Sequence, residues 1–545
     1  MKERQPIKQW TLGIALCVTL THGPFAFSTA YADSAPLQQA LTQQLTAVEA
    51  HSLPIAEFYQ LRDGKPVWQS ERAVESLVSA LGRLESDGLV PADYHADTLL
   101  NEFQRSQSGG TEAQAAFDIK TTQALLLALD HLERGKVNPR EVEPHWDAPR
   151  PERSYSLLRV MHAVEDHELD SAIALVRPSS VEYQQLRNAL KHHYQLAELG
   201  SAPYLAPRDA SLRPGDEADD VVVLRQRLAL WGESDLMVAD NTAYPMVRLE
   251  TASNRRTFDT GLEAAVKRFQ RRHLLQEDGV VGEQTRLALN TPVASRIDQL
   301  RVNLERARWI RLTHSAEPRV WVDIAGYRMH YIRPNGQHWD ARVVVGTSRR
   351  ETPIIHSTIS HLTINPSWTI PPTIMREDVL PRVRADIDYL ARENIQVVNL
   401  SGEQLNPDEV DWQRPGGVML RQTAGARNPL GSVVVRFPNN DMIYLHDTPA
   451  RGLFQRNQRA LSSGCVRVEG VTELAQMLLQ DTGSHYQMSS LLSGGSDRNI
   501  NLPQRIPVAL HYLTAWPNAQ GEVEFRPDIY RRDATLLSAL KRPQV

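Results

Sequence analysis

The chain has 545 residues, with 60 Lys and Arg against 65 Asp and Glu and a formal net charge of −5 at pH 7. Because domains usually span about 100 to 200 residues, a single compact core is excluded and about three folded units are expected. Isolated basic pairs such as Arg255-Arg256 and Arg271-Arg272 in a mildly acidic chain are typical of solvated helix faces. We therefore expect no nucleic-acid partner.

An export signal is expected in residues 1–32. Three basic residues precede an apolar run, Trp10–Leu20, and Ala30-Tyr31-Ala32 forms a small-residue cleavage pattern before Asp33. The run is shorter than the roughly 20 residues needed to cross a bilayer, which favours a cleaved signal over a retained anchor. Cleavage removes the three basic residues and Glu3, so the net charge changes from −5 to −7 and an exported protein remains.

A helical unit is predicted over residues 33–204. Apolar residues recur there at three- and four-residue spacing, as in Val74–Leu81 and Ala124–Leu132. Its histidines, including His192-His193, show no metal-ligand pattern, so surface or packing roles are expected. The pattern indicates a helical scaffold domain and no chemistry.

A second, smaller helical unit is predicted over residues 205–292, after a polar, Pro-containing stretch at 206–220. The run 265–273, followed by Asp278-Gly279 and the residues up to Thr285, resembles the peptidoglycan-binding domain appended to many wall enzymes. Residues between Trp231 and Asp259 are additional to the usual compact module. The resemblance implies wall binding, and a purely structural spacer is the alternative.

A helical connector over residues 293–317 leads to a mostly β unit, 318–545, in which alternation replaces helical spacing. Strands are predicted at Val320–Ile324, Arg328–Ile332, Val343–Val345, Leu362–Ile364, Val433–Phe437, Met442–Leu445 and Val508–Tyr512. Turn residues at 438–440 and 518–521 are expected to join hairpins. Residues 375–415 interrupt the pattern with charged, helix-prone sequence, which predicts a helical lid beside a cleft. The fold class expected is multidomain α+β.

The candidate chemistry lies between Tyr444 and Glu469. Removal of the signal takes away Cys17 and leaves Cys465, nineteen positions after His446. A free thiol, with a pKa near about 8.5, needs a neighbouring base or cation to become a thiolate. Histidine can take that proton and later protonate a leaving amine. Each residue alone fits a buried thiol or a strand-end histidine, but together they predict a nucleophile and its base.

The residues around the thiol suit attack on a carbonyl group. Gly464 permits close approach of the backbone, and the turn Ser462-Ser463-Gly464-Cys465 can aim successive N–H groups at an oxyanion. Arg467 shares a face with Cys465 if the chain is extended, and could then orient a substrate carboxylate. Tyr444 is a further candidate substrate contact. A folding role is the alternative for Arg467 and Tyr444.

The pattern of His446, a loop and Ser462-Ser463-Gly464-Cys465-Val466-Arg467 resembles the signature of the L,D-transpeptidases, whose YkuD-type β domain carries a Ser/Thr-x-Gly-Cys turn. The segments Asn365–Pro372 and Asn428–Gly431 extend the resemblance. The domain order is similar to that of the large periplasmic YcbB-like branch. Many members have histidine in place of Ser463, so His446 is expected to act here as the sole base.

The resemblance implies a peptidoglycan reaction in the periplasm. Cys465 would attack the third, diamino residue of a tetrapeptide donor stem, release D-Ala and form a thioester, which the side-chain amine of an acceptor stem resolves into a 3-3 cross-link. Members of the family are acylated by carbapenems. Partners are then the two stem peptides, with cell-wall synthesis proteins as further candidates. No metal and no organic cofactor is expected, and no HExxH, Cys-x-x-Cys or Gly-rich nucleotide loop is found.

Three other functions are possible, and the first two use the same cysteine and histidine. L,D-carboxypeptidase activity would use water to resolve the thioester, and attachment of a protein to the wall would use another amine. A non-catalytic wall-binding scaffold would use the helical units alone. A papain-like protease is disfavoured because its cysteine precedes its histidine in sequence.

Overall fold

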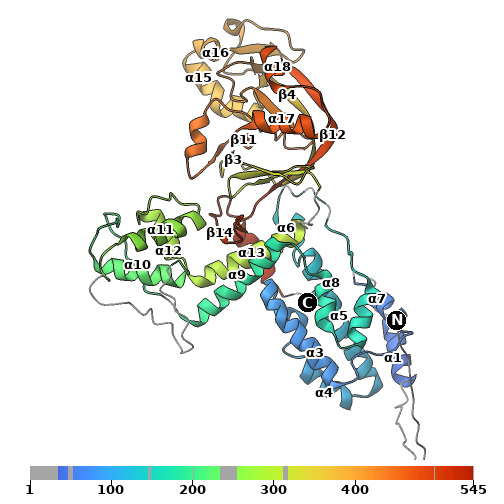
Figure 1. Cartoon of the computed structure of the whole chain (residues 1–545). Helices are drawn as coiled ribbons and strands as arrows, with labels where there is room; N and C mark the ends of the chain where they lie inside the picture. The colour runs from blue at the N-terminus through green and yellow to red at the C-terminus, as the bar shows by residue number, and fades with distance from the viewer. Residues whose placement is uncertain are drawn as a thin grey trace, which may run out of the picture.

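A computed structural model of the chain describes residues 35–46, 53–233, 255–310 and 317–543, apart from residues 145, 147, 149, 201 and 496. The predicted export signal lies outside these ranges, as do residues 234–254 of the additional segment in the second unit and residues 311–316 at the end of the connector. No helix in the described ranges is both long enough and apolar enough to cross a membrane. Figure 1 shows two helical units below a β domain.

The N-terminal unit is helical, as predicted, and surrounds one long helix. Its helices are α1 (Ala35–Leu45), α2 (Ile55–Gln60), α3 (Glu71–Gly82), α4 (Leu99–Ser108), α5 (Gly110–Arg134), α6 (Pro139–Val142), α7 (Leu157–Glu165) and α8 (Leu169–Val176). Asp118 of α5 is fully buried and accepts N–H groups from Val67 and Trp68 and the hydroxyl of Tyr59. These bonds satisfy a carboxylate that would otherwise be costly to bury.

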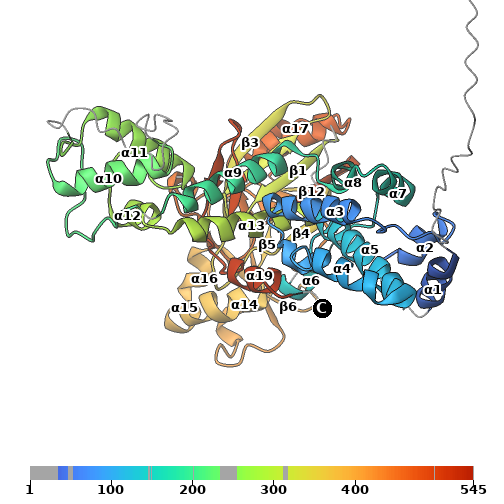
Figure 2. The same cartoon turned by 90° about the horizontal axis from the view of Figure 1, so that it is seen from below.

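Two helices connect the parts of the molecule. α9 (Val181–Glu198) and α13 (Val293–Ile310) run side by side between the N-terminal unit and the small helical module (Figure 2). The module contains α10 (Asp219–Leu230), α11 (Thr260–Arg272) and α12 (Glu283–Leu289). Gln270 bonds Asp278 and the Gly279 N–H, which fixes the predicted turn. α13 is therefore a packed element of the structure as well as a connector.

The β domain is built on a nine-stranded sheet in the order β10-β3-β11-β9-β8-β4-β12-β1-β2. Its strands are β1 (Arg319–Asp323), β2 (Arg328–Ile332), β3 (His338–Gly346), β4 (Ile355–Ile364), β8 (Val433–Arg436), β9 (Leu445–His446), β10 (Ala460–Ser462), β11 (Val466–Val468) and β12 (Arg498–His511). β2 also pairs with β3, so the sheet closes on itself. Apolar side chains of α17 (Val471–Asp481) pack against the sheet in the core of the domain, and α18 (Met488–Ser493) follows.

The structure confirms six of the seven predicted strands, and the one expected at Met442–Leu445 is shorter and lies further along the chain, at Leu445–His446. Met442 has a positive φ of 55°, so the chain bends there and β9 begins at Leu445. The hairpin predicted at 438–440 joins β8 and β9. The hairpin predicted at 518–521 joins β13 (Ala515–Pro517) and β14 (Val523–Phe525).

The segment predicted as a helical lid forms part of a larger insertion, residues 368–422, with its own apolar core. Its helices are α14 (Pro372–Ile374), a π-helical turn at Met375–Val379, α15 (Leu380–Ala385) and α16 (Asp388–Arg392). It also contains a three-stranded sheet of β5 (Trp368–Thr369), β7 (Val418–Gln422) and β6 (Ile395–Asn399). These strands form because Ile395, Val397 and Leu420 supply buried side chains at strand spacing.

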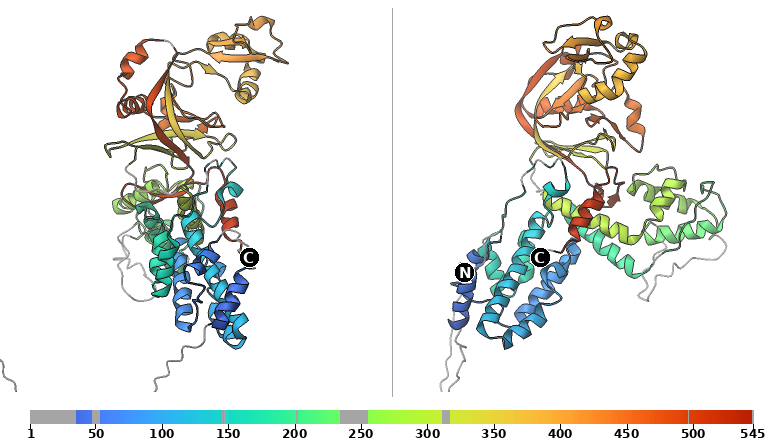
Figure 3. Two further views of the ribbon diagram at one scale, coloured as in Figure 1. Left: turned by 90° about the vertical axis from the view of Figure 1, so that its right-hand side faces the viewer. Right: turned by 180° about the vertical axis from the view of Figure 1, so that it is seen from behind.

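The C-terminal segment returns to the helical N-terminal unit. After β14, α19 (Asp533–Leu540) lies against the scaffold helices (Figure 3). Nζ of Lys136 donates to the carbonyl oxygens of Leu540 and Arg542, each at 2.8 Å. Glu143 accepts a hydrogen bond from Arg532 at 3.0 Å and lies 3.7 Å from Arg306. These contacts, between residues about 400 positions apart, thus join the C-terminal segment to the N-terminal unit.

Replacing Glu143 by Gln should destabilise the protein by about 3 kcal/mol, because it leaves Arg306 and Arg532 buried with less compensating charge. Glu143 is 2% exposed. Urea unfolding would measure the loss. The neighbouring Glu141 is exposed, so Glu141→Gln is the matched control and should change stability by less than about 0.5 kcal/mol. Equal losses of stability from the two substitutions would contradict this role of Glu143.

Candidate active site

Two short parallel strands bring the predicted nucleophile and base together. β9 pairs with β11 so that Leu445 lies opposite Val466 and His446 opposite Arg467, and the Val466 N–H donates to the Tyr444 carbonyl at 3.1 Å. Leu445 and Val466 are buried in the core. Because side chains alternate along a strand, Tyr444, His446, Cys465 and Arg467 share the other face.

The environment of His446 keeps its imidazole neutral. Its Nδ1 lies 2.5 Å from the carbonyl oxygen of Asp447, which can only accept, so Nδ1 carries the proton and Nε2 has the free lone pair. The side chain is 4% exposed. Burial, and next the positive charge of Arg467, lowers the pKa of His446 to about 3. The imidazole is therefore unprotonated at neutral pH.

Asp447 is held by a segment that was predicted only by resemblance. Its carboxylate accepts the Ser432 N–H at 3.0 Å and the Ser432 hydroxyl at 2.9 Å. Gly431 has a φ of +62°, and a Cβ there would lie 2.5 Å from the Asp447 side chain. Asn428 fixes the start of this segment by donating to the Pro366 carbonyl at 2.9 Å. The Asn428–Gly431 segment thus positions the residue that sets the tautomer of His446.

The thiol of Cys465 is protonated in the resting protein. Burial raises its pKa above the ordinary value, although hydrogen bonding to Tyr444 and the charges of Arg436 and Arg467 act in the opposite direction. Sγ donates to the Met442 carbonyl at 3.7 Å. The Tyr444 ring packs edge-on against His446 with centroids 5.8 Å apart, and the Arg436 guanidinium lies 4.5 Å from the Tyr444 centroid. The thiol and the imidazole are therefore each neutral at pH 7.

Hydrogen bonds within the turn before the thiol fix its conformation. Ser462 is buried, and its Oγ donates to the Cys465 carbonyl at 2.5 Å and accepts the Gly464 N–H at 3.1 Å. Gly464 has a φ of +114°, a conformation that favours glycine. The Gly464 N–H, one of the predicted oxyanion donors, is thus engaged by Ser462. Ser462 supports the turn from beneath.

Thr352 is a residue that the sequence did not indicate. Its hydroxyl donates to the Gly464 carbonyl at 2.6 Å and accepts the Gly346 N–H at 2.9 Å, while its own N–H donates to the Tyr530 hydroxyl at 3.1 Å. In a trans peptide the carbonyl and the following N–H point in opposite directions. By holding the Gly464 carbonyl, Thr352 fixes the direction of the Cys465 N–H, the other predicted oxyanion donor.

Ser463 contacts the insertion through an arginine. The Ser463 hydroxyl accepts a hydrogen bond from Arg350 at 2.9 Å. The same guanidinium pairs with Glu377 and Asp378 of the π-helical turn, each at 2.6 Å. Arg350 thus connects the turn before the thiol to the insertion.

Arg467 has a buried donor that no other described group satisfies. Among the described residues, its Nε is buried without a hydrogen-bond partner. Burial lowers the pKa of Arg467, and the neighbouring thiol acts in the opposite direction. A substrate carboxylate would satisfy this donor. Within the described ranges, no group of three or more His, Cys, Asp and Glu side chains could hold a metal ion.

Comparison with protein families assigns all three parts of the chain. Residues 317–487 match the L,D-transpeptidase catalytic domain (YkuD). This part of the chain is thus similar to an L,D-transpeptidase catalytic domain. Residues 217–289 match a "Putative peptidoglycan binding domain", and residues 54–190 match a scaffold domain.

Three named proteins are similar to parts of this chain. A Haemophilus influenzae protein named "Putative L,D-transpeptidase" is 37% identical over 239 residues, which are 43% of this chain and 48% of the relative. The chain thus spans about half the length of that relative. A solved L,D-transpeptidase from Xylanimonas cellulosilytica is 16% identical, with coverage of 56% of this chain and 100% of the other, at a TM-score of 0.17. One from Stackebrandtia nassauensis is 12% identical, with coverage of 57% and 97%, at a TM-score of 0.21.

Thr352→Val should slow acylation of Cys465 in the L,D-transpeptidase domain by about 10- to 100-fold, because the Cys465 N–H loses its fixed direction and removal of an oxyanion donor costs about 100- to 1,000-fold. Mass spectrometry after carbapenem addition would measure the rate. Alkylation by iodoacetamide forms no oxyanion and should keep its rate. Thr482→Val, which also removes a buried hydroxyl bonded to a carbonyl, is the matched control. Parallel losses in acylation and alkylation would contradict this role.

The acid limit of acylation should lie well below the ordinary histidine range. Because the pKa of His446 is held at about 3, acylation should persist to about pH 5. Arg467→Gln removes a charge that lowers this pKa, so the pKa rises and the acid limb moves to higher pH. Arg456→Gln, at an exposed position of the loop between His446 and Cys465, should leave the pH profile unchanged. A wild-type limb near pH 6.5 would contradict the neutral-pair description.

Proposed function

We propose that this protein is a cysteine-dependent peptidoglycan L,D-transpeptidase that forms 3-3 cross-links. The observation that carries the proposal is the parallel pairing of β9 with β11, which places Cys465 and His446 on one face. It occurs within a domain that matches the L,D-transpeptidase catalytic domain. The substrates proposed are a tetrapeptide donor stem and an acceptor stem.

The first half of the reaction forms a thioester. Nε2 of His446 accepts the thiol proton as Sγ attacks the carbonyl carbon of the third, diamino residue of the donor. The Cys465 N–H, oriented through Thr352, donates to the oxyanion. The C–N bond to the terminal D-Ala then breaks, and the imidazolium returns its proton to the leaving amine. D-Ala departs and the acyl group stays on sulfur.

The second half transfers the acyl group to an amine. The side-chain amine of the acceptor stem attacks the thioester carbonyl, and His446 accepts a proton from the nitrogen. The C–S bond breaks, the thiolate recovers the proton and the resting neutral pair is restored. In the first step the thiol proton moves to His446 while the bond between sulfur and the carbonyl carbon forms. The proton does not move earlier, because a thiol with a raised pKa does not lose its proton to an imidazole whose pKa is about 3.

The surroundings of the thiol supply substrate contacts and a lid in this proposal. Arg467 binds a donor carboxylate through its buried Nε, and Tyr444 borders the acyl group. The insertion covers the site and is joined to it at two points, through Arg350 to Ser463 and through Trp368 to Tyr444. Restricting water around the thioester favours an amine as the acceptor.

In this proposal the remaining parts of the chain bring the catalytic domain to the cell wall and hold it there. The signal pattern in residues 1–32 supports export, and we propose the periplasm as the location. The module at 217–289, similar to a peptidoglycan-binding domain, would hold the protein on its polymeric substrate. The scaffold domain fixes the catalytic domain through Glu143 and Lys136.

Cys465→Ala should abolish 3-3 cross-linking while the protein still binds isolated sacculi, because the sulfur is lost and the module at 217–289 is unchanged. Wall incubated with each protein would be digested and its stem dimers measured by liquid chromatography and mass spectrometry. Wild-type protein should yield 3-3 dimers. Trimmed monomers alone would favour the carboxypeptidase, and dimers formed by the Ala variant would refute the cysteine mechanism.

A further inference from the structure

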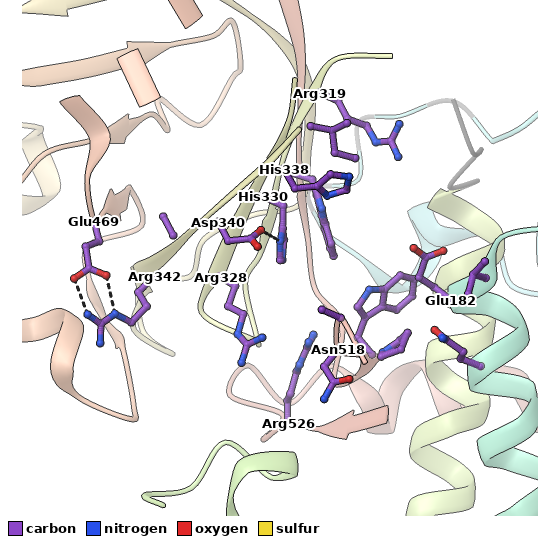
Figure 4. A pocket seen from close by; sticks show the side chains of 18 residues that line it. Glu182, Arg319, Arg328, His330, His338, Asp340, Arg342, Glu469, Asn518 and Arg526 are labelled. Atoms are coloured by element: carbon purple, nitrogen blue, oxygen red, sulfur yellow. Dashed lines mark hydrogen bonds and ion pairs between the residues drawn. The ribbon is translucent and has the colours of Figure 1, made fainter. Parts of the chain in front are cut away.

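A cavity of about 810 Å³ lies away from the thiol, between the β domain and the start of α9. Its floor is the outer face of β1, β2 and β3, and its walls come from α9 and from the turn after β13 (Figure 4). The volume is within the range of ligand sites, about 300 to 1,000 Å³, and such sites are frequent between domains. No role assigned above uses this cavity.

Strand alternation explains why its floor is polar. In β1, β2 and β3 the residues Val320, Val322, Met329, Tyr331 and Val343 point into the core. The alternate residues therefore face outward in cross-strand rows. One row is Trp321, His330 and Asp340, and the next is Asp323, Arg328 and Arg342.

Arg328 and Arg342 are placed directly opposite each other in the β2–β3 ladder. Like charges in this position destabilise a sheet, so packing alone does not favour the pair. Each guanidinium has an acidic neighbour: Glu524 lies 3.4 Å from Arg328, and Glu469 lies 2.6 Å from Arg342. The two arginine side chains are nevertheless 40% and 42% exposed, so a ligand in the cavity can reach both.

A third arginine, Arg459, adds positive charge behind this end of the cavity. Arg459 is anchored to the carbonyls of Val343 and Tyr327. Burial, and next the charges of Arg342 and Arg328, lowers its pKa to about 10. A carboxylate placed between Arg328 and Arg342 would relieve this repulsion and could accept paired N–H bonds.

The other end of the cavity is acidic and aromatic. Glu182 of α9 and Asp340 line it, and Asp340 contacts Nδ1 of His330 at 2.5 Å. Trp321 and Trp516 supply an apolar surface, with ring centroids 6.1 Å apart. A ligand with carboxylates, an amine and a short apolar body therefore complements the lining.

We propose that this cavity binds a carboxylate-bearing stem peptide of peptidoglycan, separate from the stem that reacts with Cys465. The inference rests on the proposed function for its ligand. β3 runs from the cavity at Asp340 to Gly346, which bonds Thr352 beneath the thiol turn. At about 3.3 Å per residue the two sites lie about 20 Å apart along the strand. One wall fragment with two stems can therefore occupy both.

The test uses the full chain with Cys465→Ala, so that the probe is not consumed, and a purified disaccharide-tetrapeptide. Hydrogen exchange should show protection of residues 328–342 on addition of the probe. In Arg328→Gln/Arg342→Gln that protection should require at least about tenfold more probe, since hydrogen bonds to charged groups are lost. Arg333→Gln, on the same sheet but paired with Asp481, is the matched control and should behave like the parent.

Two further measurements make the test decisive. Arg328→Lys/Arg342→Lys keeps the charge and should retain most of the affinity, so a loss equal to that of the glutamine pair would overturn carboxylate recognition. The disaccharide without its peptide should give no protection of 328–342, and protection equal to that by the full probe would overturn the peptide assignment. Unchanged protection in the glutamine pair would refute the inference alone. Failure of Cys465 acylation, measured separately with the wild-type protein, would instead refute the proposed function.

Discussion

The parallel register between β9 and β11 is the constraint on which the candidate site depends. It places Cys465 and Arg467 beside Tyr444 and His446, although the two pairs of residues are far apart in the sequence. Strands of two and three residues cannot maintain this register alone. β8 on one side and β3 on the other hold them, and apolar α17 side chains pack against the sheet that contains them. The closed sheet therefore determines the geometry of the site.

Burial gives this site its resting charge state. It raises the pKa of the Cys465 thiol and lowers that of His446, so both groups are neutral. Arg467 lowers both pKa values, which favours the thiolate but disfavours the imidazolium. The same residue thus helps the nucleophile and keeps the base free of a proton. A substrate carboxylate on Arg467 would weaken the effect on His446 and make proton transfer easier when the donor is bound.

The sequence predicted the elements that have local patterns. Alternation identified most strands, helical spacing identified the scaffold, and the residue types around Cys465 and His446 identified the pair that the structure brings together. Thr352 and Arg350 could not be found in this way, because they contact Gly464 and Ser463 across 112 and 113 positions and belong to no local motif. The bend at Met442 was also missed, since positive φ at a methionine has no sequence signal.

The link between Ser463 and the insertion is exposed to solvent. Arg350 is 21% exposed, while Glu377 and Asp378 are 37% and 46% exposed. Ion pairs between exposed groups are weakened by solvent. Water, and a charged stem bound nearby, can therefore compete for both pairs. By contrast, Thr352 bonds Gly464 from a buried position. The contact of the turn with the insertion is thus exposed, while the contact that orients the Cys465 N–H is buried.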